Sequence, residues 1–278
     1  MKRINKWIVD KYLIDTSYQK ELLSQLENES FEIYQGDYIP FLKEDLFLPE
    51  EFKNNPVGIY GSFEFVREYT KKYKNILSFG ATDNFKCSTY LSYSNTDFFL
   101  NNTPFFTTFS LFEKNIEKWM SLFSNNIFIR PDSGFKTFTG LPLNKNNCDF
   151  ELNSLKRLTG AQPETLILVS SGANIQSEYR LIVCDKKVVG KSSYMINGKI
   201  KTDVSVPNEV LAYAKKYLEE TEWTPDSCFV MDIARLKNGD FYIIEFNAFS
   251  HSDFYESNFA EIFDAASRYL YEENCEID

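Results

Sequence analysis

Histidine is almost absent from this sequence, which contains a single one, His251, in 278 residues. A metal site built from several histidines is therefore excluded within one chain, and a histidine-dependent nucleophile would have to use His251. No G-x-S-x-G segment accompanies it. The remaining polar groups are carboxylates, amides, lysines and arginines, which bind magnesium and phosphate. We expect His251 to be a loop residue without a chemical role, with substrate contact as the alternative.

Paired cysteines, long apolar runs and excess positive charge are also missing. The five cysteines show no C-x-x-C spacing, which is typical of reduced thiols in a cytoplasmic protein rather than of bridges or zinc ligands. No apolar run is long enough to span a membrane, and Asp10 and Lys11 interrupt the amino-terminal segment, which argues against a signal peptide. A formal charge of −10 and a pI near 4.9 speak against a nucleic-acid partner, because phosphate backbones need clustered Lys and Arg.

Two familiar nucleotide-binding signatures are missing as well. Residues 189–193 (VGKSS) resemble the end of a P-loop, but Asp185 stands where the first glycine is required and no helix is expected after Lys191. The H-R-D, D-F-G and glycine-rich signatures of protein kinases do not occur. A nucleotide site in this chain would have to be built from other elements.

The residues that are present predict a globular α/β protein, since 43% of them are hydrophobic. Residues 1–104 alternate between strand and helix patterns, which favours a small parallel α/β lobe. The expected strands lie at 7–10, 31–36, 56–62 and 75–80, and the expected helices at 17–28 and 63–73. The Asn-rich segment 98–106 is predicted to connect this lobe to the rest of the chain.

Residues 105–278 predict antiparallel strands with helices on one side, an α+β arrangement. Helices are expected over 109–123, 150–160, 207–223 and 258–271, and strands over 127–133 and 165–171. Two further reversals, at Asp185-Lys186 and at Asn197-Gly198, predict hairpins between residues 178 and 200.

The segment 231–250 (MDIARLKNGDFYIIEFNAFS) predicts another hairpin. Its Asn238-Gly239 pair favours a type I′ turn, in which both central residues need a positive φ. Counting outward from this turn pairs Leu236 with Phe241 and, further along, Asp232 with Glu245.

The expected pairing makes Asp232 and Glu245 direct cross-strand neighbours, with Asn247 on the face of Glu245. Like charges in this position destabilise a sheet, so a divalent cation bound by carboxylate and amide oxygens would explain them. A solvated sheet edge with two unrelated acids is the alternative. The opposite face is expected to enter a core through Ile233, Ile244 and Phe246.

Basic residues in two other segments predict an anion site. Arg130 lies within an apolar strand and Lys136 follows in a glycine-bearing loop, 133–140, an arrangement that suits phosphate, although an outward-facing strand cation is the alternative. A two-residue turn at Asp185-Lys186 would pair Arg180 with Lys191, and other turn lengths would shift this partner. Glu178 is expected on the same strand face as Arg180.

Taken in order, these segments resemble the ATP-grasp superfamily, particularly bacterial and phage members that carry an arginine in place of a strand lysine. The resemblance rests on Arg130, Lys136, the strands LILVSS and EYRLIV, and the closing MDIA…IIEFNAF, and it covers roughly residues 105–278. The E-x-N of Glu245 and Asn247 is its most specific part. The sequence departs from the family in Arg130 and in the connection VSSGANIQS, which has no acidic residue before Glu178.

The resemblance implies a pre-ATP-grasp-like domain over 1–104 and an ATP-grasp domain over 105–278, whose two subdomains, about 105–168 and 169–278, close around ATP and Mg²⁺. It implies that Arg130 and Lys136 contact phosphates, that the backbone near Val169, Ser170 and Ser171 contacts the adenine, and that Glu178 contacts the ribose. It implies catalytic roles for Arg180 and Lys191 at the phosphates or at an acyl phosphate. It also implies that Asp232, Glu245 and Asn247 bind magnesium.

The implied reaction is an ATP-dependent ligation of a carboxylate to an amine through an acyl phosphate, with small molecules or peptides as substrates. Such chemistry needs positioning and charge neutralisation rather than a histidine base. The alternatives are a small-molecule kinase of the same fold and a nucleotide-binding module without turnover.

Overall fold

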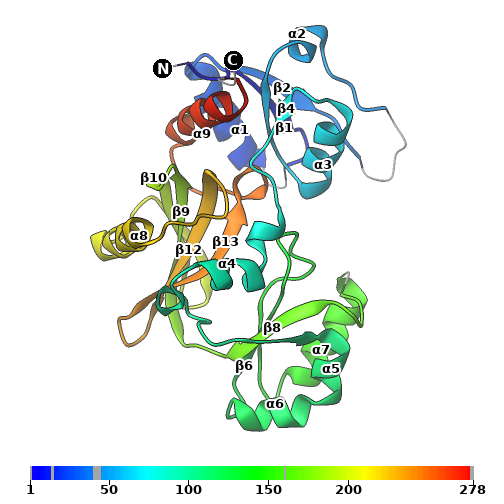
Figure 1. Cartoon of the computed structure of the whole chain (residues 1–278), viewed down its shortest axis with the longest axis vertical. Coiled ribbons are helices and arrows are strands. Elements are labelled where there is room, and N and C mark those ends of the chain that lie inside the picture. Colours follow the sequence, from blue (N-terminus) through cyan, green and yellow to red (C-terminus); the bar gives the residue numbers. More distant parts are fainter. Residues whose placement is uncertain (1, 14–15, 40–44, 160, 276–278) are drawn as a thin grey trace.

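The computed structural model describes residues 2–13, 16–39, 45–159 and 161–275. Its three sheets follow one another along the long axis of the molecule (Figure 1). The first sheet is parallel and the other two are antiparallel, so the expected order of an α/β lobe followed by an α+β part is confirmed.

The amino-terminal sheet has the strand order β2-β1-β3-β4, and every pair in it is parallel. Its central strands are short apolar runs buried on both faces, as parallel strands under helices should be. The strands are β1 (Lys6–Asp10), β2 (Glu32–Gly36), β3 (Val57–Tyr60) and β4 (Ile76–Leu77), and the helices are α1 (Thr16–Asn28), α2 (Glu50–Lys53) and α3 (Phe63–Lys72).

The connection to the next sheet is folded into short helices. It contains η1 (Asp83–Phe85), α4 (Cys87–Tyr93) and η2 (Thr96–Phe98). Phe85, Tyr90 and Phe98 pack into the core of the central sheet rather than into the amino-terminal lobe. The boundary at residue 104 therefore remains a proposed division of the chain, with these helices lying against the second part.

The small antiparallel sheet, at the opposite end from the amino-terminal lobe, has the order β5-β8-β6-β7. Its strands are β5 (Phe105–Thr108), β6 (Ile127–Pro131), β7 (Leu141–Leu143) and β8 (Leu166–Ser171). Its helices are α5 (Phe109–Lys114), α6 (Ile116–Leu122) and α7 (Cys148–Leu158). The single helix expected over 109–123 is wrong, because Asn115 adopts φ −117° and ψ 21° and its side-chain amide donates to the Leu111 carbonyl, which interrupts the helix. Gly160, at the end of the helix expected over 150–160, lies outside the described residues.

The central sheet has the order β11-β10-β9-β12-β13 and is antiparallel throughout. Its strands are β9 (Ile175–Cys184), β10 (Lys187–Ile196), β11 (Lys199–Asp203), β12 (Cys228–Leu236) and β13 (Phe241–Ala248), and its helices are α8 (Asn208–Glu220) and α9 (Phe259–Cys275), with η3 (Phe249–His251) after β13. Leu181 and Met231 face α8, whereas Ile182 and Val230 face α9. The sheet is therefore buried on both faces, one by each helix.

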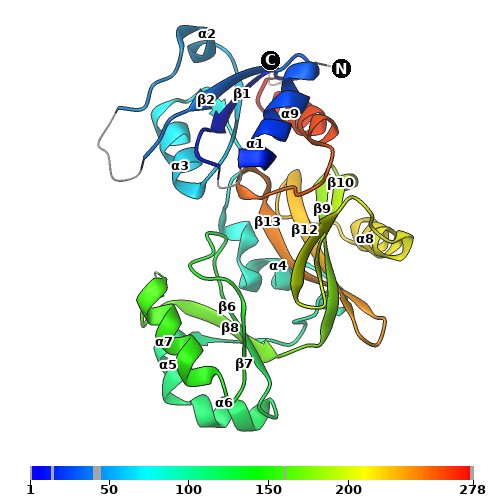
Figure 2. The same cartoon turned by 180° about the vertical axis from the view of Figure 1, so that it is seen from behind.

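Helix α9, near the end of the chain, packs against the beginning of the chain. It lies beside α1, close to both termini (Figures 1 and 2). Ile4 donates its backbone N–H to the Ser267 carbonyl at 3.2 Å, and the Trp7 indole donates to the Ser267 hydroxyl at 2.9 Å. One apolar cluster contains Trp7, Ile182 and Ile262, so the amino-terminal lobe and the central sheet share a core.

Cys87, Cys148, Cys184 and Cys228 are free, buried thiols, and the side chain of Cys275 lies outside the described part. Among the helices of the described ranges, none has both the length and the apolar character that a membrane crossing requires.

Candidate functional site

The two acids of the last hairpin are cross-strand partners, as expected: Asp232 of β12 pairs with Glu245 of β13. The expected turn is wrong, however. Gly239 has a φ of 97° but Asn238 does not enter the left-handed region, and the Gly239 N–H donates to the Leu236 carbonyl at 2.9 Å. The turn therefore holds an extra residue, so that Arg235, and not Leu236, pairs with Phe241.

A β-bulge at Ile244 restores the register, because Ile233 pairs with Ile243 while Asp232 pairs with Glu245. The bulge also redirects the side chain of Ile244. Ile233 and Phe246 enter the core as expected, but Ile244 lines a cavity on the other face. The prediction that Ile244 enters the core is therefore wrong.

Glu245 is neutralised by cations from the small sheet. Its Oε2 accepts from an Arg130 guanidinium nitrogen at 2.8 Å, and its Oε1 accepts from the Lys136 ammonium at 2.9 Å. Arg130 also donates to the Ile244 carbonyl at 3.1 Å, next to the bulge. Burial alone would raise the pKa of Glu245, but Lys136, Arg130 and a hydrogen bond from Asn247 hold it well below its usual range. Glu245 is therefore ionised at neutral pH.

Asp232 is neutralised by its neighbour on the other side, Arg180 of β9, which is its cross-strand partner. The guanidinium donates from Nε to Oδ1 at 2.9 Å and from an Nη to Oδ2 at 2.8 Å, while its other Nη donates to the Asp253 carbonyl at 2.9 Å. This two-point contact fixes the plane of the guanidinium. The Asp232 side chain is 0% exposed, so solvent cannot replace Arg180 as the partner of its charge.

Asn247 links the two acids. Its Nδ2 donates to Asp232 Oδ2 and to Glu245 Oε1, each at 3.0 Å. Its Oδ1 is buried and has no hydrogen-bond partner in the described part of the chain. A buried amide oxygen without a partner costs free energy. If the amide turned about its Cβ–Cγ bond, it would present this oxygen to a cation beside the acids.

Asp232, Glu245 and Asn247 fit a magnesium site with only a few protein ligands. Within residues 2–13, 16–39, 45–159 and 161–275, no group of three or more His, Cys, Asp or Glu side chains is arranged to hold a metal. Two carboxylates and one amide oxygen would have to be completed by other oxygens. Magnesium is commonly held in this way, by one or two carboxylates together with substrate phosphates.

A cavity of about 470 Å³ opens beside this network, between the small sheet and the central sheet. Its wall includes the charged side chains of Arg130, Lys136, Arg180 and Glu245. It also includes the apolar side chains of Leu100, Phe128, Ile175, Met195 and Ile244. A ligand with a flat apolar part and an anionic part matches this mixed lining.

The predicted nucleotide contacts are only partly brought to this cavity. Ser171 lines it, followed by Gly172 and Ala173. Val169 does not, because its backbone is paired on both sides, with Phe105 and with Ile129. Ser170 is also buried, and its hydroxyl donates to Asn101 Oδ1 at 2.7 Å. Of the three residues predicted to contact adenine, only Ser171 therefore lines the cavity, and the adenine contact itself stays a prediction.

Glu178 does line the cavity. The hydroxyl of Tyr194 donates to its carboxylate. Burial raises the pKa of Glu178 above its ordinary value despite this hydrogen bond. Tyr194 occupies a bulge in β10, since Ser193 pairs with Tyr179 and Met195 with Glu178. Both bulges near the site, at Tyr194 and at Ile244, therefore turn a side chain into the cavity.

Tyr194 and Tyr255 are functional candidates that the sequence did not reveal. Their rings stack with centroids 5.1 Å apart, and the Arg180 guanidinium carbon lies 5.4 Å from one centroid and 4.9 Å from the other. Tyr255 has a φ of 51°, which is uncommon for an aromatic residue. This positive φ belongs to a loop, and no periodic pattern could have indicated it.

Lys191 does not join the site, and its predicted pairing with Arg180 is wrong. The two-residue turn is present, with φ of 48° at Asp185 and 56° at Lys186, but a bulge at Val189 shifts the register so that Ser192 pairs with Arg180. A slip of one residue moves a side chain to the other face of a sheet.

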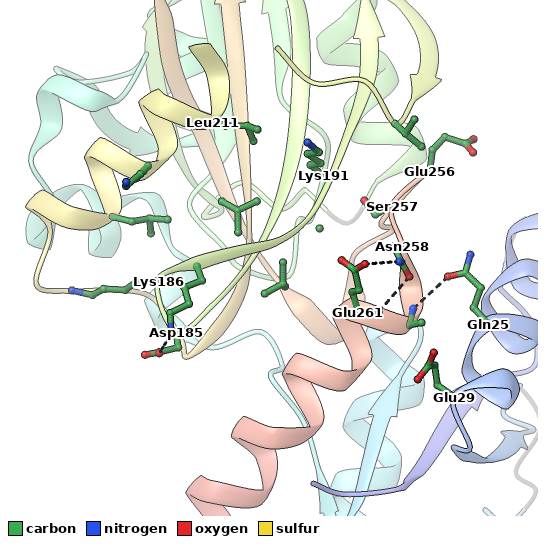
Figure 3. Close-up of a pocket in the computed structure, with 18 of the residues that line it drawn as sticks. Gln25, Glu29, Asp185, Lys186, Lys191, Leu211, Glu256, Ser257, Asn258 and Glu261 are labelled. Carbon is green, nitrogen blue, oxygen red and sulfur yellow. Dashed lines mark hydrogen bonds and ion pairs between the residues drawn. The ribbon is translucent and has the colours of Figure 1, made fainter. Parts of the chain in front are cut away.

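Lys191 instead lines a separate groove of about 1340 Å³ bounded by α1, β10, α8 and the start of α9. Figure 3 shows it there between Leu211 and Glu256. Among the residues that line the cavity near Glu245, Lys191 does not occur.

His251 lies outside the cavity near Glu245 as well. Its ring packs on Phe63 with centroids 4.3 Å apart, and its Nδ1 lies 3.3 Å from the Gly61 carbonyl. Burial lowers the pKa of His251 to about 4, so the ring is neutral at physiological pH. His251 lies at the end of η3 rather than in a loop, and its lack of a chemical role stays a prediction.

Proteins of known structure share the fold of this chain. A sequence search of curated proteins gave no match. Three of the solved structures with this fold are described here, all at low identity. A D-cycloserine synthetase, DcsG, has a TM-score of 0.55 at 10% identity and covers 95% of this chain and 99% of its own.

N5-carboxyaminoimidazole synthetase from Staphylococcus aureus has a TM-score of 0.56 at 12% identity, covering 96% of this chain and 79% of its own. The macrocyclase MdnC, bound with precursor peptide MdnA from Microcystis aeruginosa MRC, has a TM-score of 0.53 at 12% identity, covering 97% and 100%. The family model described as "ATP-grasp domain, R2K clade family 2" matches residues 110–265, more than half of the 278 residues. The chain therefore belongs to the ATP-grasp family.

Proposed function

We propose that this protein is an ATP-dependent ligase that joins a carboxylate to an amine through an acyl phosphate. The family and its ligase relatives support the coarser statement, an ATP-dependent ligase. The observation that supports the phosphoryl-transfer step of the finer one is the convergence of Arg130, Lys136 and Arg180 on a single cavity beside the Asp232–Glu245 pair. Transfer of a phosphoryl group requires this combination of cations and metal-binding oxygens.

In this proposal the adenine lies against the apolar wall formed by Phe128, Ile175 and Met195, next to the backbone of Gly172 and Ala173. Glu178, on the same wall, accepts from the ribose hydroxyls. The phosphates then extend toward Arg130 and Lys136, whose charges match them.

Lys136 lies in the loop between β6 and β7 that we expect to cover the phosphates. Its backbone φ of 46° turns this loop back toward the central sheet, where the ammonium meets Glu245. Phe135, its neighbour, contacts Phe63 of the amino-terminal lobe with ring centroids 5.9 Å apart. The loop thus contacts both the amino-terminal lobe and the central sheet, and in this position it would exclude water from the reacting phosphate.

Asp232, Glu245 and Asn247 would hold magnesium, which would supply positive charge to neutralise the phosphates. Arg180, held in one plane by Asp232, would direct its guanidinium at the oxygens of the transferred group. The carboxylate substrate would attack the γ-phosphate to give an acyl phosphate and ADP. The amine would then attack the acyl carbon and release phosphate.

ADP release in the presence of candidate acceptors tests this proposal. The relatives include enzymes that act on small molecules and one bound to a peptide, so the panel should contain amino acids and short peptides. We expect ADP release that depends on a carboxylate together with an amine. Phosphorylation of a hydroxyl without amine dependence would indicate a kinase, and nucleotide binding without ADP release across the panel would indicate a passive module.

The placement of the two lysines gives a direct comparison within the site. Lys136→Ala is expected to lower kcat/KM for ATP by about 10²-fold, because one preorganised cation at the phosphates is lost. Lys191→Ala is expected to leave it unchanged within about twofold, since typical effects of substitutions remote from the site are small. A loss in Lys191→Ala comparable to that in Lys136→Ala, measured as ADP release, would contradict the placement of the phosphates.

A further inference from the structure

The loop 252–255, which follows η3, supplies a third contact to the Arg180 guanidinium. Its Nε and one Nη bind Asp232, and the other Nη donates to the Asp253 carbonyl at 2.9 Å. A guanidinium has five N–H groups, and these contacts use three of them. In the described part of the chain, one N–H on each Nη therefore remains for the cavity that Arg180 lines.

The peptide unit between Asp253 and Phe254 is held at both ends. Its carbonyl accepts from Arg180, and its N–H, which belongs to Phe254, donates to the hydroxyl of Tyr18 at 3.0 Å. Because a peptide unit is planar, a contact that fixes its N–H also fixes the direction of its carbonyl. Tyr18 and Arg180 are therefore bound to opposite ends of one rigid group.

A second tyrosine holds the preceding carbonyl of the same loop. The hydroxyl of Tyr60 donates to the Ser252 carbonyl at 2.9 Å, and it lies 2.6 Å from the hydroxyl of Tyr18. A hydroxyl has a single proton, and that of Tyr60 is used by Ser252, so Tyr18 must be the donor between the two hydroxyls. The bonds therefore run in one direction, from the Phe254 N–H through both hydroxyls to the Ser252 carbonyl.

These hydrogen bonds join the amino-terminal lobe to the guanidinium. Tyr18 belongs to α1 and Tyr60 ends β3, whereas Arg180 lies in β9 of the central sheet. Burial raises the pKa of both tyrosines above the ordinary value, so both hydroxyls keep their protons. Hydrogen bonds that follow one another in a buried place strengthen each other.

We propose that Tyr18 and Tyr60 are positioning residues that hold the Arg180 guanidinium toward the transferred phosphoryl group. They act through the peptide unit between Asp253 and Phe254. This inference rests on the proposed function, because it takes Arg180 to contact that group. It goes further, since it gives two residues of the amino-terminal lobe a part in phosphoryl transfer.

Tyr18→Phe and Tyr60→Phe test this role, because each removes one hydroxyl and keeps the ring. The ring contacts with Phe259 and Phe254, at centroid distances of 5.0 and 5.3 Å, are retained. ADP release is measured with ATP and the carboxylate and amine that react fastest in the acceptor panel. We expect each variant to lower kcat by about 10-fold, since misplacement of a catalytic group slows the reaction. KM for ATP should stay within about twofold, because the lost contact belongs to the transition state.

Tyr73→Phe is the matched control. It also removes a hydroxyl of the amino-terminal lobe that donates to a backbone carbonyl, that of Leu46, at 2.8 Å. Urea unfolding of the three variants measures what each lost hydrogen bond contributes to stability. We expect similar losses of stability in all three, with kcat retained in Tyr73→Phe alone. Equal kcat values in the three variants would overturn the inference.

Arg180→Lys shows whether the hydroxyls act through the guanidinium, since a lysine cannot reproduce its planar two-point contact. In this background we expect Tyr60→Phe to lower kcat by less than about twofold, because the orientation that it disturbs is already lost. A further loss of about 10-fold would indicate a general effect on the fold and would overturn the inference. The comparison with Tyr73→Phe decides the question if Arg180→Lys does not fold.

The two proposals fail in different ways. If Arg180→Lys turns over ATP at the wild-type rate, the proposed contact of Arg180 with the transferred group is wrong, and the inference falls with it. If Arg180→Lys is impaired while both tyrosine variants behave as Tyr73→Phe, only the role of the two tyrosines is wrong.

Discussion

Replacement of Glu245 by glutamine is expected to lower ATP turnover by about 10²- to 10³-fold, the range found when one preorganised electrostatic contact is removed. Glutamine keeps the shape of the side chain but cannot offer a charged oxygen to a metal. It also releases the ion pairs of Arg130 and Lys136, which lie 2.8 and 2.9 Å from the carboxylate. Both cations then become available to phosphates.

The same variant is therefore expected to bind a non-hydrolysable ATP analogue more tightly than the wild type when no metal is added. Loss of turnover together with a gain in metal-free binding would be difficult to explain by damage to the fold. Circular dichroism at the assay temperature provides the check on folding. Glu219→Gln is a suitable control, because Glu219 is an exposed helix residue whose pair with Lys215 contributes little. Undiminished turnover in Glu245→Gln would remove the proposed metal site.

Replacement of Arg180 by methionine is expected to affect both stability and activity. It leaves the fully buried Asp232 without its counter-ion, and breaking such a pair from one side costs about 3–5 kcal/mol of the free energy of unfolding. In the proposed reaction it also removes a guanidinium that stabilises the transferred group, and the loss of an arginine with that role costs about 10³- to 10⁵-fold in kcat. Urea unfolding and single-turnover ADP release measure the two effects separately.

The double variant Arg180→Met with Asp232→Asn separates them further. Removing both charges takes away the uncompensated buried carboxylate, so much of the lost stability is expected to return. Activity is expected to remain as low as in the single variant, since neither the guanidinium nor the carboxylate is restored. A double variant that regains turnover along with stability would show that Arg180 acts only by supporting the fold.

The sequence predicted the Asp232–Glu245 pair correctly, but by two errors that cancel. The turn contains one residue more than the expected Asn238-Gly239 turn, which shifts the register by one. The bulge at Ile244 shifts it back. Turn residues are encoded locally, whereas a bulge depends on what the strand packs against, here the cavity and Arg130.

The bulge at Val189 shifts the register of β10 by one residue, and no second bulge reverses this shift before residue 192. The sequence therefore places Lys191 on the wrong face of the sheet. The turn at Asp185-Lys186 was predicted correctly, and its two positive φ values confirm it. Gly190 follows the bulge in a position where a Cβ would lie 2.5 Å from Ile262, which explains the glycine but not the slip. The register of a long hairpin can therefore be counted from its turn only as far as the first bulge.

The role of Arg180 could not be predicted from either hairpin alone. It faces Asp232 because β9 pairs with β12, strands whose interacting residues lie 52 positions apart in the chain. The sequence indicates two neighbouring acids whose charges must be balanced, and it predicts that a metal ion balances them. The structure shows that Arg180, Arg130 and Lys136 already neutralise them.

The fold class was predictable because its signals are periodic and local. The parallel lobe follows from short buried strands alternating with helices, and the strands at 7–10 and 31–36 are present as expected. The break at Asn115 and the αL conformation of Tyr255 depend on single residues in a tertiary context, so the sequence did not reveal them.

A crystal structure with a non-hydrolysable ATP analogue and magnesium would test the central claim most directly. We predict the base beside Gly172 and Met195, the phosphates on Arg130 and Lys136, and a metal on Glu245 with the Asn247 amide turned toward it. A nucleotide bound instead in the groove beside Lys191, or bound in the cavity with Lys136 still paired to Glu245, would contradict it.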